Sequence, residues 1–143
     1  MTLDEQLIGE EEGRVAHVYP DSRGLLTIGI GCLVDPKIPG AGLCEAAIDA
    51  QFAHDSRTAR DIAWQFPHFA ELNEVRQAVL ISMAFQLGNK PLHWTDFMNA
   101  LTTRNYVAAA GAGRDSDWWR TQTPKRAERE MSMLALGSWV AKQ

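Results

Sequence analysis

Two carboxyl groups and a hydroxyl near the start of the chain are of types that could take part in cleaving a glycosidic bond. Glu12 ends a segment of helical spacing, Asp21 lies in a polar turn, and Thr27 follows in a segment of alternating residues. Hydrolysis of a glycoside without a cofactor needs one protonated carboxyl group to release the leaving oxygen and one ionised carboxylate to activate water or attack the sugar. Glu12 and Asp21 are candidates for this pair.

The two carboxyl groups have unlike predicted environments, as a division into acid and base roles requires. Glu12 follows two other glutamates at the negative end of a predicted helix, which disfavours its ionised form. Asp21 lies in an open polar turn, where it can stay charged. Taken singly, each residue also has an ordinary structural explanation: a solvated helix face, a turn aspartate and, for Thr27, a strand former.

The element that carries Glu12 is predicted to be a helix over residues 3–12. Thr2 can cap its N-terminus, with Glu5 three residues later completing a capping box. Gly13 is a plausible C′ glycine. These signals place Glu12 in the last turn of the helix.

The elements that carry Asp21 and Thr27 are predicted to be β structure. Residues 20–24 have turn chemistry at nearly every position. After the turn, aliphatic residues at 26, 28 and 30 alternate with Thr27 and two glycines. We expect the aliphatic face to pack on a core, and the face with Thr27 to be approachable by a ligand.

The rest of the chain is predicted to be a loop over 35–42 and then helices. A long helix is expected over about 43–65, with Ile48, Phe52, Ala59 and Ile62 facing inward. Shorter helices are expected over residues 75–87, 94–101, 106–112, 118–120 and 126–142. The predicted fold class is α+β, a single domain over 1–143. Its small N-terminal lobe (about 1–50) contains a β-hairpin or sheet, and a long helix joins it to a mostly helical C-terminal lobe (51–143).

Three ordered motifs resemble the phage-type lysozymes, the T-even bacteriophage group of muramidases. Glu12-Gly13, the turn over 19–24 and Thr27-Ile28-Gly29-Ile30-Gly31 are similar to that family's catalytic signature. The segments 76–88 and 119–127 are similar to its central helix and C-terminal motif. The resemblance covers almost the whole chain and implies a two-lobed lysozyme-like fold.

The resemblance also implies roles for individual residues. Glu12 would be the general acid, and Asp21 with Thr27 would position the attacking water, giving inversion at the anomeric carbon. Arg126 would lie against Glu12 as a supporting residue. The cleft would be lined by Gly31, Leu33, Phe85 and Gln86; for Phe85, a core position is an equal alternative.

The implied activity is that of a muramidase, which hydrolyses the β-1,4 bond between N-acetylmuramic acid and N-acetylglucosamine in peptidoglycan. No metal or other cofactor is implied. One alternative is a lytic transglycosylase, which needs a single acid and has no need of Asp21 and Thr27. Another is a non-catalytic module that binds cell walls or builds virions, for which loss of Glu12 or Asp21 would be the expected signature.

Composition bounds the partners and the compartment. The 143 residues carry a net charge of −4, so bulk charge does not indicate nucleic-acid binding. Residues 1–88 hold 13 acidic and 6 basic residues, whereas the remainder holds 5 acidic and 8 basic residues. This opposed charge is compatible with the two walls of a cleft or with two solvated surfaces. The two cysteines, Cys32 and Cys44, are expected to be reduced. With no signal peptide or membrane span evident, we expect the protein to be made in the host cytoplasm. A monomer is the default expectation. A holin-type pore would let it reach the periplasmic wall, without stable membrane association.

Overall fold

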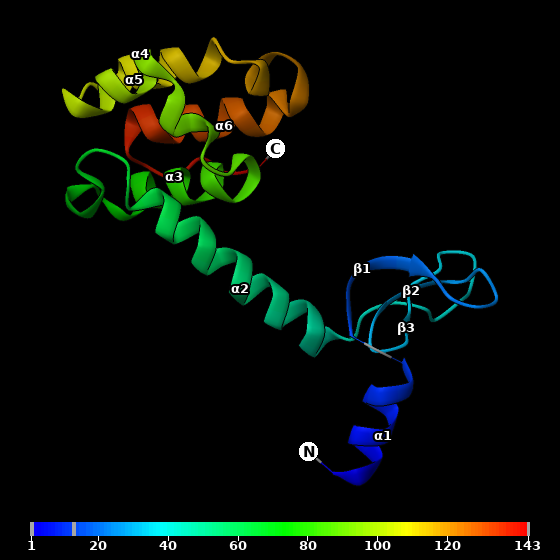
Figure 1. Ribbon diagram of the computed structural model, residues 1–143. Helices are drawn as coiled ribbons and strands as arrows, with labels where there is room; N and C mark the ends of the chain where they lie inside the picture. Colours follow the sequence, from blue (N-terminus) through cyan, green and yellow to red (C-terminus); the bar gives the residue numbers. More distant parts are fainter. Residues whose placement is uncertain (1, 13, 143) are drawn as a thin grey trace. The chain divides into compact units, whose positions relative to one another are not determined.

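The computed structural model describes residues 2–12 and 14–142, so Gly13, the predicted C′ glycine, lies outside the described residues. The chain forms two compact units, Met1–Gln51 and Phe52–Gln143, which are described separately. A small antiparallel sheet lies in the first unit, and the second is helical (Figure 1). The predicted α+β class is confirmed.

The first unit begins with α1 (Leu3–Glu12), whose bounds agree with the prediction. The capping box is present: the Thr2 N–H donates to Glu5 Oε2 at 2.8 Å, and the Glu5 N–H donates to Thr2 Oγ1 at 3.4 Å. These two reciprocal bonds satisfy backbone donors that the first turn of a helix leaves unpaired. The local sequence therefore accounts for where this helix begins.

The three strands that follow form one antiparallel sheet in the order β1-β2-β3. Their bounds are Val15–Pro20, Leu26–Gly29 and Cys32–Leu33. Thr27 on the central strand pairs with Tyr19 on one side and Leu33 on the other. Because directly opposed residues of antiparallel strands share a face, Thr27 lies between two larger side chains.

The prediction of which sheet face is buried was wrong. Thr27 is 4% exposed, whereas Leu26 and Ile30 are 38% and 44% exposed. The alternation itself is correct, since neighbouring strand residues point to opposite faces. The error arose because the burial of a strand residue depends on its cross-strand partners, here Tyr19 and Leu33.

The loop and long helix lie where the sequence predicted them. Residues 34–44 contain no helix or strand, and α2 spans Glu45–Ala63. Ala59 is buried and Ile62 half-buried, but Ile48 and Phe52 are exposed, so the prediction that all four face inward was wrong. The buried residues of α2 are Ser56, Ala59 and Ala63, so burial is confined to its C-terminal half.

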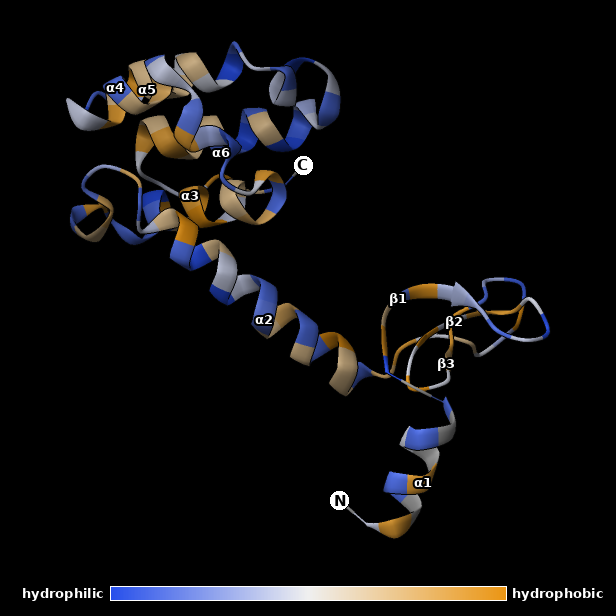
Figure 2. Cartoon of the chain, viewed as in Figure 1, coloured by the Kyte–Doolittle hydropathy of each residue, from blue (hydrophilic) through white to orange (hydrophobic). Residues whose placement is uncertain are grey.

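The second unit packs its helices around one apolar core. Its main helices are α3 (Glu74–Leu87), α4 (Thr95–Thr102), α5 (Tyr106–Arg114) and α6 (Pro124–Leu136). Short segments fill the connections: 3₁₀ turns at Phe69–Glu71 and Lys90–His93, and a π-helix at Trp118–Gln122. Figure 2 shows α3 as a largely hydrophobic helix, whereas hydrophobic and hydrophilic residues alternate along α6. The largest fully buried side chains include Trp118, Phe97, Leu80 and Met83.

The last helix is shorter than predicted. It was expected to reach Lys142, but α6 ends at Leu136, and Gly137 adopts the left-handed conformation with φ 69°. Arg76 of α3 donates from Nε to the Leu134 carbonyl at 2.9 Å and from Nη2 to the Ala135 carbonyl at 3.1 Å. These bonds satisfy carbonyls that a helix end leaves unpaired, which stabilises the termination at this point.

Candidate functional site

Glu12, the predicted acid, is the final residue of α1 and is exposed. Its carboxylate lies directly over Gly31, in the turn between β2 and β3. A Cβ atom on residue 31 would lie 2.8 Å from Glu12 Oε2 and 3.1 Å from Glu12 Cδ. Gly31 also has φ +64°, in the region that favours glycine. The absence of a side chain at residue 31 therefore leaves the space that the carboxylate occupies.

Asp21 lies in the turn between β1 and β2, where its carboxylate is held by backbone donors. The N–H groups of Arg23 and Leu25 each donate to Oδ1 at 2.8 Å, while Oδ2 lies 3.8 Å from Arg23 Nε. The bond from the Leu25 N–H is the main cause that lowers the pKa of Asp21 below its ordinary value, with Arg23 adding to it. The expectation that Asp21 stays ionised agrees with this environment.

Thr27 is connected to Asp21 through one residue, Leu25. The Leu25 carbonyl accepts the N–H of Asp21 at 2.8 Å and the hydroxyl of Thr27 at 3.2 Å. Together with the bond from the Leu25 N–H to Oδ1, these contacts fix both side chains to the same residue. The hydroxyl oxygen of Thr27 retains acceptor capacity, because its hydroxyl donates to Leu25. The first unit thus brings an ionised carboxylate and a hydroxyl into one hydrogen-bonded turn.

The remaining predicted cleft residues are divided between the units. Leu33 is half-buried in β3, as is Gln86 in α3, whereas Phe85 is exposed. Phe85 is therefore not a core residue; its ring lies 6.0 Å from that of Phe52, centroid to centroid. Gln86 donates to Thr123 Oγ1 at 3.0 Å and accepts from the Trp118 indole at 2.9 Å. The Gln86 side chain therefore has a structural role within the helical unit.

Arg126 lies near the start of α6 and makes its contacts within the second unit. It donates from Nε to Glu130 Oε1 at 2.8 Å and from Nη2 to Ser82 Oγ at 2.8 Å. Neither Glu130 nor Ser82 was predicted as a partner of Arg126. The spacing of four residues between Arg126 and Glu130 on one helix was a signal for the first. No local pattern could have indicated Ser82, which is 44 residues away along the chain.

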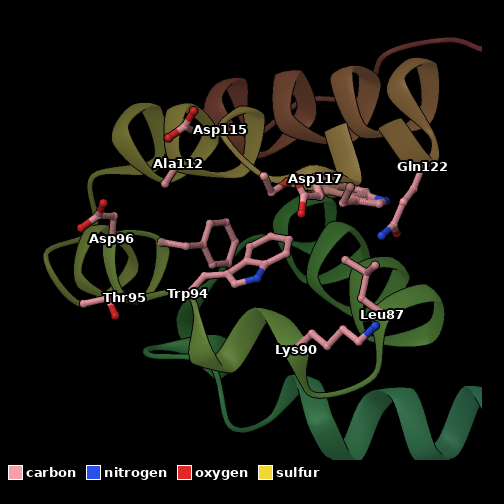
Figure 3. A pocket seen from close by; sticks show the side chains of 12 residues that line it. Leu87, Lys90, Trp94, Thr95, Asp96, Ala112, Asp115, Asp117 and Gln122 are labelled. Carbon is pink, nitrogen blue, oxygen red and sulfur yellow. The ribbon is translucent and has the colours of Figure 1, made fainter. Parts of the chain in front are cut away.

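A cavity in the helical unit was also not predicted. It has a volume of about 510 Å³ and is lined by residues of α4, α5 and the π-helix, among others. Figure 3 shows the Trp94 indole lying across it, with Asp117 and Gln122 at its edges. None of the predicted site residues lines this cavity.

The comparison with known families decides the identity. The family model described as phage lysozyme matches residues 9–131, most of the chain. The chain belongs to the phage lysozyme family. The match includes all three predicted catalytic residues, and membership supports a lysozyme-type function acting on peptidoglycan.

Two relatives of the chain differ in their own length. The chain is 26% identical to the "Pre-baseplate central spike protein Gp5" of Enterobacteria phage T4, with 93% of the chain aligned but only 28% of the relative. It is 24% identical to the "Probable T4-type lysozyme 1" of Dictyostelium discoideum, with 90% of the chain and 91% of the relative aligned. The chain therefore spans under a third of the first relative and nearly all of the second.

Two structural features bear on metal binding and membrane association. Among the residues that the structure describes, no group of three or more His, Cys, Asp or Glu side chains is arranged to hold a metal ion. Within the same described ranges, every helix is too short or too polar to cross a membrane. Both cysteine thiols are free, and Cys32 Sγ lies 3.7 Å from the Gly42 carbonyl oxygen.

The contact between Glu12 and Gly31 leads to a prediction. Gly31→Ala should lower the rate of cell-wall cleavage by roughly 10- to 100-fold, because the new methyl group displaces the Glu12 carboxylate. Gly29→Ala is the matched control: Gly29 has a similar φ of +70°, but no atom would lie within 4 Å of its Cβ. Both variants should lose about 1–2 kcal/mol of stability to backbone strain. Turbidity loss and thermal unfolding measure the two effects, and equal activity in the two variants would contradict the prediction.

Proposed function

We propose that this protein hydrolyses the β-1,4 bond between N-acetylmuramic acid and N-acetylglucosamine in peptidoglycan. Glu12 acts as the general acid, and Asp21 with Thr27 positions the attacking water. The observation that carries the proposal is that the side chains of Asp21 and Thr27 both form hydrogen bonds with the backbone of Leu25. This segment lies inside the range that the family model matches. A hydrolase needs such a water-holding pair, whereas a transglycosylase does not.

The chemistry follows from the free acceptor atoms of the pair. Asp21 Oδ1 already accepts two backbone N–H groups, whereas among the described residues Oδ2 has only the 3.8 Å approach of Arg23. A water can donate one proton to Oδ2 and the other to Thr27 Oγ1, which directs its lone pair at the anomeric carbon. Attack by this water on the face opposite the leaving oxygen, which Glu12 protonates, inverts the anomeric configuration.

The biological setting extends the proposal. We infer a monomeric endolysin that accumulates in the host cytoplasm and reaches the periplasmic wall through a holin-type pore. Neither a nucleic acid nor a stable membrane attachment takes part. The relative named as a central spike protein supports a second setting, in which the same activity is carried by a virion. Detection of the chain in purified virions, rather than only in the lysate, would favour that second setting.

Turbidity loss and product analysis test the proposed activity. The wild-type protein should clear Gram-negative cells whose outer membrane has been permeabilised. Mass spectrometry should find hydrolysed muramic acid ends, and early NMR spectra should show the inverted anomer. Products lighter by one water would instead identify a lytic transglycosylase. Binding to walls without any clearing would identify a non-catalytic wall-binding module.

A further inference from the structure

The proposed mechanism does not use Glu130 on α6, a buried acid whose side chain is 7% exposed. Glu130 Oε1 accepts hydrogen bonds from Arg126 Nε at 2.8 Å and from Ser82 Oγ at 2.7 Å. Arg126 Nη2 also donates to Ser82 Oγ at 2.8 Å and to the Ser82 carbonyl at 3.1 Å. The three side chains therefore form a closed hydrogen-bonded ring between α6 and α3.

A stabilising role explains Glu130 poorly. Its second oxygen, Oε2, is buried and has no hydrogen-bond partner among the residues that the structure describes. A buried polar atom without a partner lowers stability, and replacing a buried ion pair by well-packed apolar residues is often neutral or stabilising.

Glu128, two residues earlier on the same helix, shows the contrast. Both of its oxygens have partners: Oε1 accepts from Arg114 and Ser132, and Oε2 accepts from Arg114 and the Trp119 indole. The hydrogen bonds from Arg114 are the main cause that lowers the pKa of Glu128 to about 2. Glu128 is therefore the structural acid of this helix, and it provides a control for Glu130.

The ring of bonds fixes which edge of the Arg126 guanidinium is available. A guanidinium has five N–H donors in a planar fork, and here Nε and Nη2 are engaged by Glu130 and Ser82. In the part of the chain that the structure describes, the two N–H groups of Nη1 have no partner, and the Arg126 side chain is 40% exposed. A guanidinium held in this way presents a fixed donor edge that suits a carboxylate.

We propose that Glu130 and Ser82 are positioning residues, which hold Arg126 so that its Nη1 edge binds a carboxylate required for cleavage. The inference rests on the proposed function. The carboxylate belongs to the peptidoglycan substrate. Glu130 acts through Arg126 and does not itself touch the reacting atoms.

A double-mutant cycle tests the proposal. Glu130→Met removes the buried acid, with its unpaired Oε2, while keeping similar volume. Because the Arg126 side chain is 40% exposed, water can hydrate its freed donors, so the melting temperature of the variant should change little. Its kcat/KM should nevertheless fall by roughly tenfold, close to the loss in Arg126→Ala. Adding Glu130→Met to Arg126→Ala should then have no further effect. Glu130→Gln, which keeps an oxygen acceptor for Nε, should retain most of the activity. As the matched control, Glu128→Gln should unfold at a lower temperature with unchanged kcat/KM.

The kinetic constants test whether the carboxylate belongs to the substrate. A higher KM in Glu130→Met supports a substrate carboxylate, and a lower kcat with unchanged KM would contradict it. Wild-type kcat/KM in Glu130→Met, or losses that multiply in the double variant, would overturn the positioning role.

An NMR measurement separates this inference from the proposed function. The Arg126 Nε–H resonance should exchange slowly in the wild type and rapidly in Glu130→Met, whether or not the protein cleaves cell walls. Slow exchange in a wild-type protein without lytic activity would contradict the proposed function alone. Equal exchange in both proteins would contradict the holding of Arg126 by Glu130.

Discussion

Glu12→Gln is expected to reduce the rate of turbidity loss by roughly 10³-fold or more, because the leaving oxygen then receives no proton. The amide has nearly the shape of the carboxyl group, and Glu12 is exposed at the end of α1, so the fold should be unaffected. Thermal unfolding checks this directly: the free energy of unfolding of the variant should lie within about 0.5 kcal/mol of that of the wild type. The large effect comes from losing a transferable proton, not from losing a contact.

Glu10→Gln is the matched control for this result. Glu10 lies two residues earlier on the same helix, and its carboxylate accepts a hydrogen bond from Gln6 at 2.9 Å. Because an amide oxygen can accept the same bond, this variant should keep wild-type activity and stability. Comparable losses in Glu10→Gln and Glu12→Gln would point to the charge of α1, and lysis that survives in Glu12→Gln would remove Glu12 from the mechanism.

The elements determined by local signals were predictable from the sequence. The bounds of α1 depend on the capping box of Thr2 and Glu5, whose two reciprocal bonds are both present. Likewise, α3 begins where the Asn73 side chain accepts the Arg76 N–H and ends before Gly88 at φ 62°. In each case the residues that start or stop the helix adjoin it, so a short window of sequence contains the cause.

The errors concern features that depend on distant parts of the chain. Thr27 is buried because Tyr19 and Leu33 flank it in the sheet, and strand register is not visible from alternation alone. The end of α6 did have a local signal in Gly137, but apolar residues beyond it continue the helical spacing. The stop is reinforced by Arg76, which comes from another helix.

The candidate site divides in the same way. Asp21 was recognisable because turn chemistry and the carboxylate lie in one short segment, and its backbone bonds come from residues two and four positions later. The ring around Arg126 was not recognisable as a whole, because Ser82 reaches it from α3. A buried acid such as Glu130 becomes notable only when its burial is known, which sequence periodicity alone does not give.

Asp21→Asn is expected to reduce the hydrolysis rate on the order of 10²- to 10³-fold, because an amide cannot accept the proton of the attacking water. The amide side chain of this variant keeps an oxygen that accepts the N–H groups of Arg23 and Leu25, so the turn should persist. Asp35→Asn is the matched control: Asp35 also accepts two backbone N–H groups, from Leu26 and Lys37, but has no assigned role in cleavage.

The pH dependence of the rate gives an independent check on Asp21. The bond from the Leu25 N–H lowers the pKa of Asp21, so the carboxylate stays ionised until the pH falls below the ordinary range of an aspartate. The wild-type rate should therefore decline on the acid side only below that range, and Asp21→Asn should lack this decline. Full activity in Asp21→Asn would mean that no carboxylate activates water, leaving Glu12 as the single acid of a transglycosylase. An acid limb that persists in the weakly active variant would instead assign the titration to another group, because residue 21 can no longer take up a proton.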